Sequence, residues 1–338
     1  MNLLKREKGF SVIICTYNGR KRLGVTLNHI INLSIPVGYD FELIIVDNRS
    51  SDLSLQFCKD FLEGLHSTIK IKYLSENNPG KAYALEKAFD NASFSHAIIC
   101  DDDNWLEPNY LTIASQVLEK FPDIGIVGGK SVPQIECEIP DWFPLVESAF
   151  VIGGQAKAPG YMDGINEYVW GAGMIFKMEI WDKLRSQDFS LVTGKNVGKA
   201  VGEDSELSLL ARILGYRLYY QDTLVFKHFM PKERIDWKVA IKYYRGFGST
   251  KPYYIFYKNF SKAGKKLSII EVEREIARLV IYITKELVIK IFTFDRNDRF
   301  QLLNLNLVWY YFLEVINVFR IRKGAYKINH FLSSLHTS

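Results

Sequence analysis

The chain has 338 residues, 48% hydrophobic and 24% charged, which is the composition of a folded globular protein and excludes an intrinsically disordered one. Its net charge of +5 is unevenly spread: residues 1–230 carry 23 basic and 29 acidic side chains, whereas residues 231–338 carry 20 and 9, so we expect the two parts to meet different electrostatic partners. The four cysteines match no zinc or CxxC redox spacing, and no stretch offers the roughly 20 uninterrupted apolar residues of a spanning helix.

Short apolar runs alternate with amphipathic segments along residues 9–125. The β-branched run at 10–18 predicts a buried first strand and not a signal peptide, because it is short and no small-residue cleavage site follows it. The alternation predicts an α/β fold, with a mostly parallel sheet that is flanked by helices on both faces. The same patterns predict strands at 41–47, 69–78 and 96–100, and helices at 19–34, 53–65 and 79–92.

The pattern changes after this first half. Residues 201–231 predict a helix with an acidic head, a stop at Gly215 and a strand that precedes His228. From residue 232 onward the chain is basic and aromatic. The remaining predicted elements are a strand at 124–132, a Gly-rich strand leading into a helix at 168–184, and amphipathic to strongly apolar helices at 275–294 and 302–327.

Polar residues follow four of the predicted strands, where ligands bind in parallel sheets. They are Tyr17-Asn18, Asp47-Asn48, Glu76-Asn77-Asn78 and the triplet Asp101, Asp102, Asp103.

The aspartate triplet places like charges side by side, which predicts a cation between them. Carboxylate oxygens suit Mg²⁺ or Mn²⁺, and such a metal typically fills its remaining positions with phosphate oxygens and water. An exposed acidic turn or a helix N-cap is the alternative for this triplet.

Five segments resemble, in order and separation, the inverting, nucleotide-sugar-dependent glycosyltransferases of family 2 with the GT-A fold. The resemblance covers about residues 9–230. It implies a GT-A catalytic domain over 1–231, with a Rossmann-like nucleotide-binding half at 9–125 and an acceptor and catalytic-base half at 126–231. The segments are "SVIICTYNGRKRLGVTLNHI", "FELIIVDNRSSD", "NNPGKAYALEKAFDNA", "ICDDDNWLEP" and "VGEDSELSLLARILGYRLYY".

The same resemblance implies a role for particular residues. Asp204 matches the catalytic base, which would take the proton from an acceptor hydroxyl, and a helix N-terminus helps to keep such a carboxylate ionised. Trp142 and Glu203 are expected near the acceptor. The metal, Mg²⁺ or Mn²⁺, is expected at Asp103, Asp101 and His228. The nucleotide and donor sugar are expected at Cys15, Thr16, Tyr17, Asp47, Lys81, Asp101, Asp102, Gly171 and Gly173.

Several of these residues also have a plain structural alternative, and Trp142 could equally be a core tryptophan. Tyr17 could be a core aromatic, Lys81 a solvated lysine, Asp47 a turn cap, and His228 a structural histidine. The acidic residues near Asp204 could be an ordinary first turn, and the glycines a β-bulge.

The resemblance implies transfer of a sugar, with a UDP-sugar as the default donor, to a glycan or lipid-linked glycan during cell-surface polysaccharide assembly. The alternatives are a catalytically silent sugar-nucleotide-binding or scaffold protein, and a nucleotidyltransferase. No nucleic-acid partner is expected.

The C-terminal region at 232–338 is expected to be mainly helical. Its mixture of cations and aromatic rings suits a membrane interface, and its segments fit helices that lie on a membrane or pack on the catalytic domain. The expected location is cytoplasmic, at the inner face of the cell membrane. An ordinary helical subdomain with a solvated basic face is the alternative.

Overall fold

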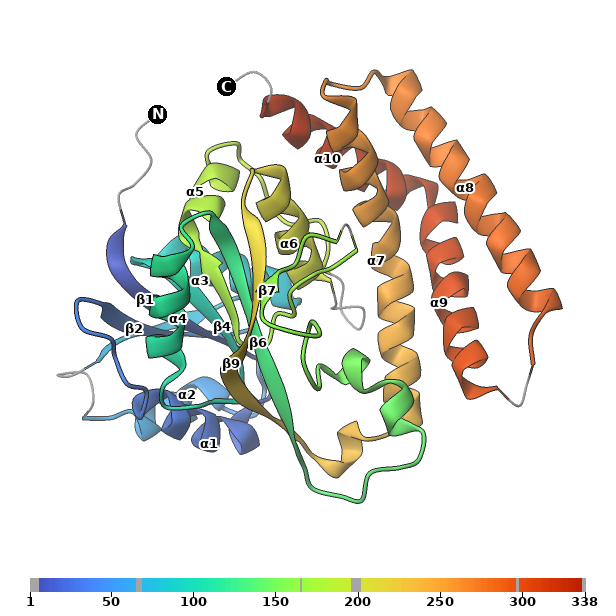
Figure 1. The fold of residues 1–338 in the computed structure, drawn as a ribbon. Helices are drawn as coiled ribbons and strands as arrows, with labels where there is room; N and C mark the ends of the chain where they lie inside the picture. The colour runs from blue at the N-terminus through green and yellow to red at the C-terminus, as the bar shows by residue number, and fades with distance from the viewer. Residues whose placement is uncertain (1–5, 65–68, 165, 196–201, 296–297, 336–338) are drawn as a thin grey trace.

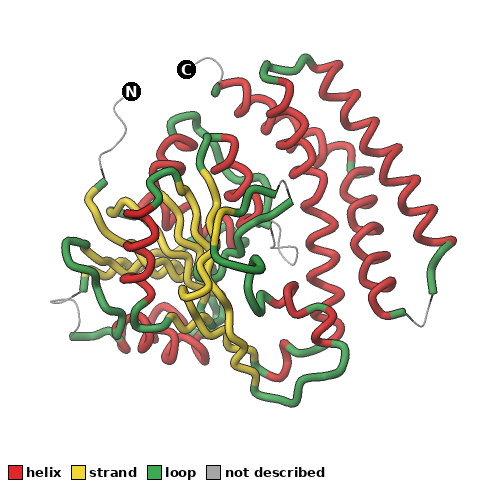
Figure 2. Tube along the Cα trace, in the orientation of Figure 1, coloured by secondary structure: helices red, strands yellow, loops and turns green. Residues whose placement is uncertain are grey.

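The computed structural model describes residues 6–64, 69–164, 166–195, 202–295 and 298–335. A twisted sheet forms the centre of the N-terminal part, and a layer of long C-terminal helices stands beside it (Figure 1). The colouring by secondary structure separates these two regions clearly, with strands confined to the N-terminal part (Figure 2). The predicted α/β class and the helical C-terminal region are both present.

The first four strands are parallel, as predicted. β1 (Glu7–Thr16) lies between β2 (Asp40–Asp47) and β4 (Phe94–Asp101), and β3 (Lys70–Ser75) adds to the outer side of β2. The β-branched run of β1 is fully buried because helices cover both faces of this part of the sheet. All four strands therefore end at the same edge, as the sequence predicted.

Alternate residues of β1 point into two separate cores. Val12 and Ile14 pack against α1 (Arg20–Ile31), α2 (Ser54–Phe61) and α4 (Tyr110–Lys120). Ile13 packs on the other face, against α3 (Lys81–Asn91), α5 (Met178–Arg185) and α6 (Glu203–Ile213). The sheet is thus covered on both sides, and its carboxyl edge is the side left for a ligand.

The second half of the sheet is mixed and not parallel throughout. β8 (Met174–Lys177) runs antiparallel to both β4 and β6 (Ile124–Ile135), whereas β6 is parallel to β9 (Arg217–Met230). Two short strands, β5 (Asn104–Leu106) and β7 (Gly160–Tyr161), run antiparallel against β9. The order is β3-β2-β1-β4-β8-β6-β9-β5, with β7 on β9. The predicted parallel arrangement therefore holds throughout the first half and, in the second half, for the pair β6 and β9.

The C-terminal region folds into four helices that share the core of the sheet domain. Phe256 and Tyr257 pack in the same buried cluster as Leu207 of α6. The innermost helix lies beside the sheet domain and the second is outermost (Figure 1). The four are α7 (Trp237–Ala263), α8 (Ile269–Phe292), α9 (Arg299–Ile316) and α10 (Val318–Ser334), and short 3-10 helices occur at Phe143–Leu145, Glu147–Phe150 and Lys232–Arg234.

None of the helices in the described parts of the chain is long and apolar enough to cross a membrane by itself. The pair α9 and α10 passes the same test of length and composition only when joined, and it bends by 83° at the break.

Candidate active site at the carboxyl edge of the sheet

A cavity of about 650 Å³ opens where the parallel strands end. Its floor is formed by residues that follow β1, β2 and β4, and its far wall by the region after β9. Tyr17 is 64% exposed at this cavity, so it is no core aromatic. The principal lining residues are Cys15, Thr16, Tyr17, Asn48, Arg49, Lys81, Asp101, Asp102, Asp103, Arg234, Lys242 and Tyr243.

Each aspartate of the triplet has its own basic partner. Lys81 Nζ lies 2.5 Å from Asp101 Oδ1. Arg22, from α1, donates two hydrogen bonds to Asp102, at 3.0 and 2.9 Å. Arg234 pairs with Asp103. Three cations from different parts of the chain thus offset the repulsion among these neighbouring carboxylates.

The carboxylate of Asp103 faces an imidazole that lacks a hydrogen-bond partner on one side. His228 is 1% exposed, and its Nε2 lies 3.6 Å from Asp103 Oδ1 without a hydrogen-bond partner in the described part of the chain. Burial alone would raise the pKa of Asp103, but Arg234 and His228 outweigh it and hold that pKa well below its usual range. An ionised carboxylate beside an unpartnered imidazole nitrogen is a donor pair that fits a divalent cation.

Those two residues make up a sparse ligand set. Within the described ranges, no group of three or more His, Cys, Asp or Glu side chains is close enough to hold a metal ion. A metal at Asp103 and His228 would therefore take most of its ligands from water or from a bound phosphate group, as Mg²⁺ commonly does.

A second cavity, of about 940 Å³, joins the first one. The two share Lys81, Asp101, Arg234 and Tyr243. Asp204 lines the second cavity from the first turn of α6, where Gly202 with φ +106° turns the chain into the helix. The shared residues thus mark the place where the two cavities meet.

Backbone amides hold the carboxylate of Asp204 in place. Gly171 N donates to its Oδ2 at 3.1 Å, and Ser205 N donates to its Oδ1 at 2.7 Å. Burial nevertheless raises the pKa of Asp204 above its ordinary value. Burial also raises the pKa of Glu203 to about 7, although Lys81 lies 3.6 Å away and opposes the shift. Carboxylates with raised pKa values in a cavity are suited to proton transfer near neutral pH.

Some residues predicted for the site lie off both cavities. One oxygen of Asp47 accepts a hydrogen bond from Ser50 N at 3.2 Å, as a turn cap does. Gly173, with φ +69°, lies behind the site, where its carbonyl accepts a hydrogen bond from Tyr110 at 2.6 Å. Trp142 packs edge-on against Trp237, with ring centroids 5.3 Å apart. Gly171 and Glu203, by contrast, line the second cavity.

Sequence reasoning missed several residues that the fold brings to the site. Asn48 accepts from Gly80 N at 2.9 Å and donates to the carbonyls of Glu76 and Asn78, so it positions the loop that carries Lys81. The segment "GRKR" was a signal for Arg22, because a basic residue in the first helix lies beside the strand ends. Arg234 had no such signal, because 131 residues separate it from Asp103.

Residues 11–178 match the sequence model of the family described as Glycosyl transferase family 2. Poly-beta-1,6-N-acetyl-D-glucosamine synthase of Staphylococcus epidermidis is 24% identical over 241 residues, 69% of this chain and 54% of that protein. Glucosyl-dolichyl phosphate glucuronosyltransferase of Haloferax volcanii is 23% identical over 244 residues, 70% of this chain and 75% of that protein. The chain therefore spans about half the length of the first of these relatives.

Solved structures show the same fold at low sequence identity. The crystal structure of Staphylococcus aureus TarS 1–349 has a TM-score of 0.52 and 15% identity, and covers 94% of this chain and 92% of that one. Mannosyltransferase PcManGT from Pyrobaculum calidifontis, in complex with GDP-Man and Mn²⁺, has a TM-score of 0.52 and 17% identity, covering 95% and 88%. The predicted α/β fold of GT-A type is confirmed.

Proposed function

This chain belongs to glycosyl transferase family 2, and we propose that it transfers a sugar from a nucleotide diphosphate sugar to an acceptor hydroxyl, with inversion at the anomeric carbon. One observation carries the proposal: a cavity at the ends of parallel strands meets a second cavity that is lined by a half-buried aspartate with a raised pKa, Asp204. A donor in the first cavity and an acceptor in the second would then meet beside Lys81 and Asp101.

The first cavity supplies the groups that a nucleotide diphosphate needs. Arg22, Lys81, Arg234 and Lys242 place cations around it, and such cations stabilise a diphosphate as it leaves. Tyr17 offers an exposed ring at the rim on which a base can stack. UDP is the default base, and the binding experiment below also includes GDP and dTDP.

Asp204 is the proposed catalytic base. Its carboxylate, fixed by two backbone amides, would draw the proton from the acceptor hydroxyl as that oxygen attacks the anomeric carbon. The attack is in line with the leaving diphosphate, so one displacement inverts the anomeric centre and no covalent enzyme intermediate forms. Glu203 would stay beside Lys81 and keep the charge balanced.

Mg²⁺ or Mn²⁺ is the proposed cofactor, held by Asp103 and His228. When bound, such an ion neutralises charge on the departing diphosphate. Asp101 is the third residue predicted for the metal, but its carboxylate pairs with Lys81. We therefore assign Asp101 to a place between metal and donor sugar, where it keeps Lys81 oriented.

Calorimetry tests the donor site directly. The protein is titrated with UDP, GDP and dTDP, each with and without Mn²⁺, next to Asp103→Ala and Asp204→Asn. We expect metal-dependent binding of one nucleotide that Asp103→Ala weakens by about tenfold or more, since the change removes a metal ligand. Asp204→Asn should keep that binding and lose donor turnover by on the order of a thousandfold.

Three outcomes would contradict the proposal. If none of the three nucleotides binds, the aspartate triplet is better interpreted as an acidic turn held by ion pairs. Full donor turnover in Asp204→Asn would show that Asp204 is not the catalytic base. An absence of turnover in the parent protein with every candidate sugar would favour a catalytically silent sugar-nucleotide-binding protein. Asp60→Asn, an exposed carboxylate on α2, serves as the matched control.

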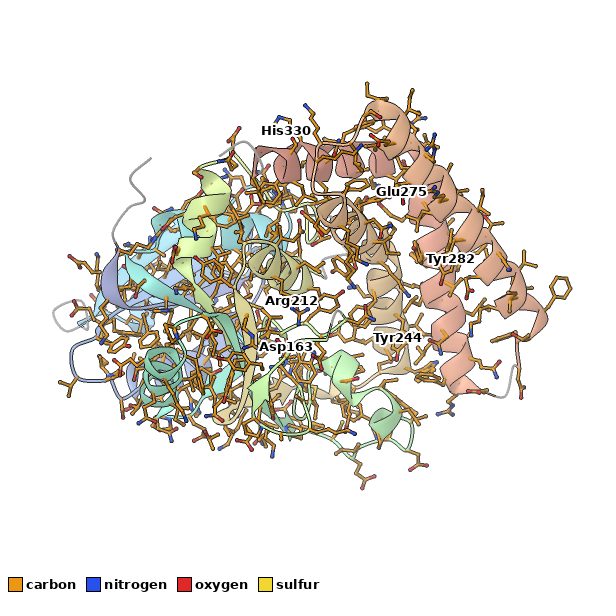
Figure 3. All side chains as sticks on the ribbon, turned by 45° about the horizontal axis from the view of Figure 1, so that its top comes forward. Asp163, Arg212, Tyr244, Glu275, Tyr282 and His330 are labelled. Atoms are coloured by element: carbon orange, nitrogen blue, oxygen red, sulfur yellow. The ribbon has the colours of Figure 1, made fainter. Side chains whose placement is uncertain are left out.

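We also propose that α8 lies on the surface of the cell membrane, at its inner face, where a lipid-linked glycan would be presented. Ile281 and Phe292 are 70% and 85% exposed, and Lys285 and Lys290 are exposed on the same helix. Tyr282, half exposed, lies on this outer helix (Figure 3). Aliphatic and aromatic side chains next to lysines suit an anionic lipid interface.

Flotation with lipid vesicles tests this proposal. The protein should float with anionic vesicles, and Ile281→Lys with Phe292→Lys should release most of it, because both changes remove apolar area from the interface. Ile35→Lys with Val37→Lys changes two exposed apolar side chains on a loop of the sheet domain and is the control. Equal flotation of both variants would contradict a docking role for α8.

A further inference from the structure

Four basic side chains gather along one side of the second cavity and beyond it. They are Arg212 of α6 and three lysines of α7, Lys251, Lys258 and Lys262. Figure 3 labels Arg212 between the sheet and the C-terminal helices. The lysines are spaced by seven and four residues, so they share one face of α7 and extend over roughly 16 Å of the helix axis.

The cluster continues the path of the acceptor cavity. Lys251 and Lys258 line the second cavity together with Asp204, and Lys258 also lines a third cavity, of about 460 Å³, with Arg212 and Lys262. Lys258 is therefore common to both cavities, and the basic side chains extend from the cavity of Asp204 toward the C-terminal end of α7.

These cations lack the partners that basic groups usually have. In the described ranges, none of the four forms an ion pair with a carboxylate. Lys258 donates to the amide oxygen of Asn166 at 2.8 Å, and Arg212 donates to two backbone carbonyls. Burial, followed by the neighbouring charges of Arg212, Lys251 and Lys262, lowers the pKa of Lys258. An anion placed among them would relieve both the repulsion and the lack of partners.

Aromatic faces accompany the charges along the same path. Lys258 Nζ lies 5.3 Å from the centre of the Tyr168 ring, and Tyr168 packs against Tyr254 at 5.8 Å. Trp170 and Phe247 line the cavity closer to Asp204. Flat apolar rings pack against the faces of sugars and polyols, whereas the cations select negative charge, so the combination suits a charged carbohydrate chain.

We propose that the acceptor is a chain with repeated negative charges, phosphodiester or carboxylate, which lies along Lys251, Lys258, Lys262 and Arg212 while its terminal hydroxyl reaches Asp204. This inference rests on the proposed function and adds the chemical class of its acceptor. The charged repeats would hold the chain in register, and the uncharged end would enter the reaction site.

Fluorescence anisotropy tests the proposal with labelled probes of equal length. The probes are a polyol-phosphate oligomer, an oligogalacturonide and a neutral dextran oligosaccharide. We expect one or both charged probes to bind, more weakly as salt is added, and dextran to bind at least tenfold more weakly. Lys258→Gln with Lys262→Gln should weaken the charged probe by about fivefold to tenfold and reduce its salt dependence.

The matched control also removes two lysine charges, but from a part of the surface outside the basic cluster. Lys59→Gln with Lys120→Gln changes two exposed lysines of the sheet domain, one on α2 and one on α4, and should leave probe binding unchanged. The stronger of the two charged probes identifies the anion as phosphate or carboxylate. Dextran binding equal to that of the charged probes would overturn the proposal, and so would a Lys258/Lys262 variant that binds like the parent.

Two further results separate the failures. Equal binding and equal lysine dependence with a single-stranded oligonucleotide of the same charge would show unspecific attraction of polyanions and would also overturn the inference. Nucleotide titration is measured on the same samples. If the parent protein binds a nucleotide but neither charged probe, this inference alone is refuted. If the parent protein binds no nucleotide, the proposed function on which the inference rests is refuted as well.

Discussion

Lys81 joins the two cavities through its ion pairs. Its ammonium group contacts Asp101 on the donor side and lies 3.6 Å from Glu203 on the base side. Burial alone would lower the pKa of Lys81, but Asp101 and Glu203 outweigh it and raise that pKa above its usual range. A permanent positive charge at this junction stabilises the ionised forms of the carboxylates around it.

Removing that charge should move the pH dependence of the reaction. The base acts only when deprotonated, so kcat/KM is expected to rise with pH through the apparent pKa of the Glu203–Asp204 pair. In Lys81→Met the carboxylates lose an attracting cation, their pKa values rise, and the acid limb of the profile should move to higher pH by roughly one unit. The measurement is nucleoside diphosphate release from the donor between pH 5 and pH 9, a range of about four units around the pKa of a proton-transfer group.

Lys21→Met, which removes an exposed lysine from α1, provides the control and should keep the parent profile. If Lys81→Met lowers the rate equally at every pH, Lys81 acts on the donor alone. The link between Lys81 and the base would then be refuted.

Site residues that lie next to a strand end can be predicted from the sequence, whereas those that are distant in the sequence cannot. Asp101 and Asp103 could be found because parallel strands end at one edge, and Lys81 could be found through the family resemblance. Arg234 could not, because nothing in its own neighbourhood marks it as the partner of Asp103. Asn48 was visible as a polar strand end, but its bonds to three backbone groups depend on a loop path that spacing does not give.

Among the elements, α7 depends on the absence of a side chain where it crosses α9. A Cβ on Gly248 would lie 2.1 Å from the carbonyl oxygen of Leu307, which is backbone and cannot rotate away. Gly24, in α1, has no contact closer than 3.4 Å at the same position. Two helical glycines therefore differ in what a methyl group would meet.

Alanine at these two positions should change the free energy of unfolding in opposite directions. We expect Gly248→Ala to lower the free energy of unfolding by about 2 kcal/mol, because overpacking pushes the two helices apart. Gly24→Ala should raise it by about 0.5 kcal/mol, because alanine favours the helix and the space is available. Urea unfolding followed by circular dichroism measures both, and a neutral Gly248→Ala would show that α7 and α9 separate easily.

Helices and strands could be predicted from the sequence wherever a single hydrophobic periodicity extended over the whole element. The helices and strands of the first half match their periodicity closely. The Gly-rich run at 168–184 contributes a strand only from Met174 onward, since the preceding residues turn around Asp204. The segment 302–327 is two helices, because Asn317 ends one and caps the next, accepting from Arg320 N at 3.2 Å. A cap inside an apolar run is easily overlooked in a sequence.

For the whole molecule, the helical region and the sheet domain form one working unit. Lys242 and Tyr243 of α7 line the first cavity, and Phe247 and Lys251 line the second. The basic charge of residues 231–338 therefore reaches the site of an acidic domain and there compensates its carboxylates. A domain boundary at residue 231 stays a prediction from composition, but both cavities need residues from each side of it.

A nucleotide in the first cavity should consequently protect both parts of the chain from hydrogen exchange. With saturating UDP and Mn²⁺, exchange is expected to slow at residues 15–22 and also at 242–246 in α7, because the bound ligand contacts both and shifts the equilibrium away from local opening. Residues 281–292 of α8, which line neither cavity, are the internal control. Protection confined to residues before 231 would mean that the donor site is complete without the helices. Protection in α7 would instead show that the basic region forms one wall of the first cavity around its bound ligand.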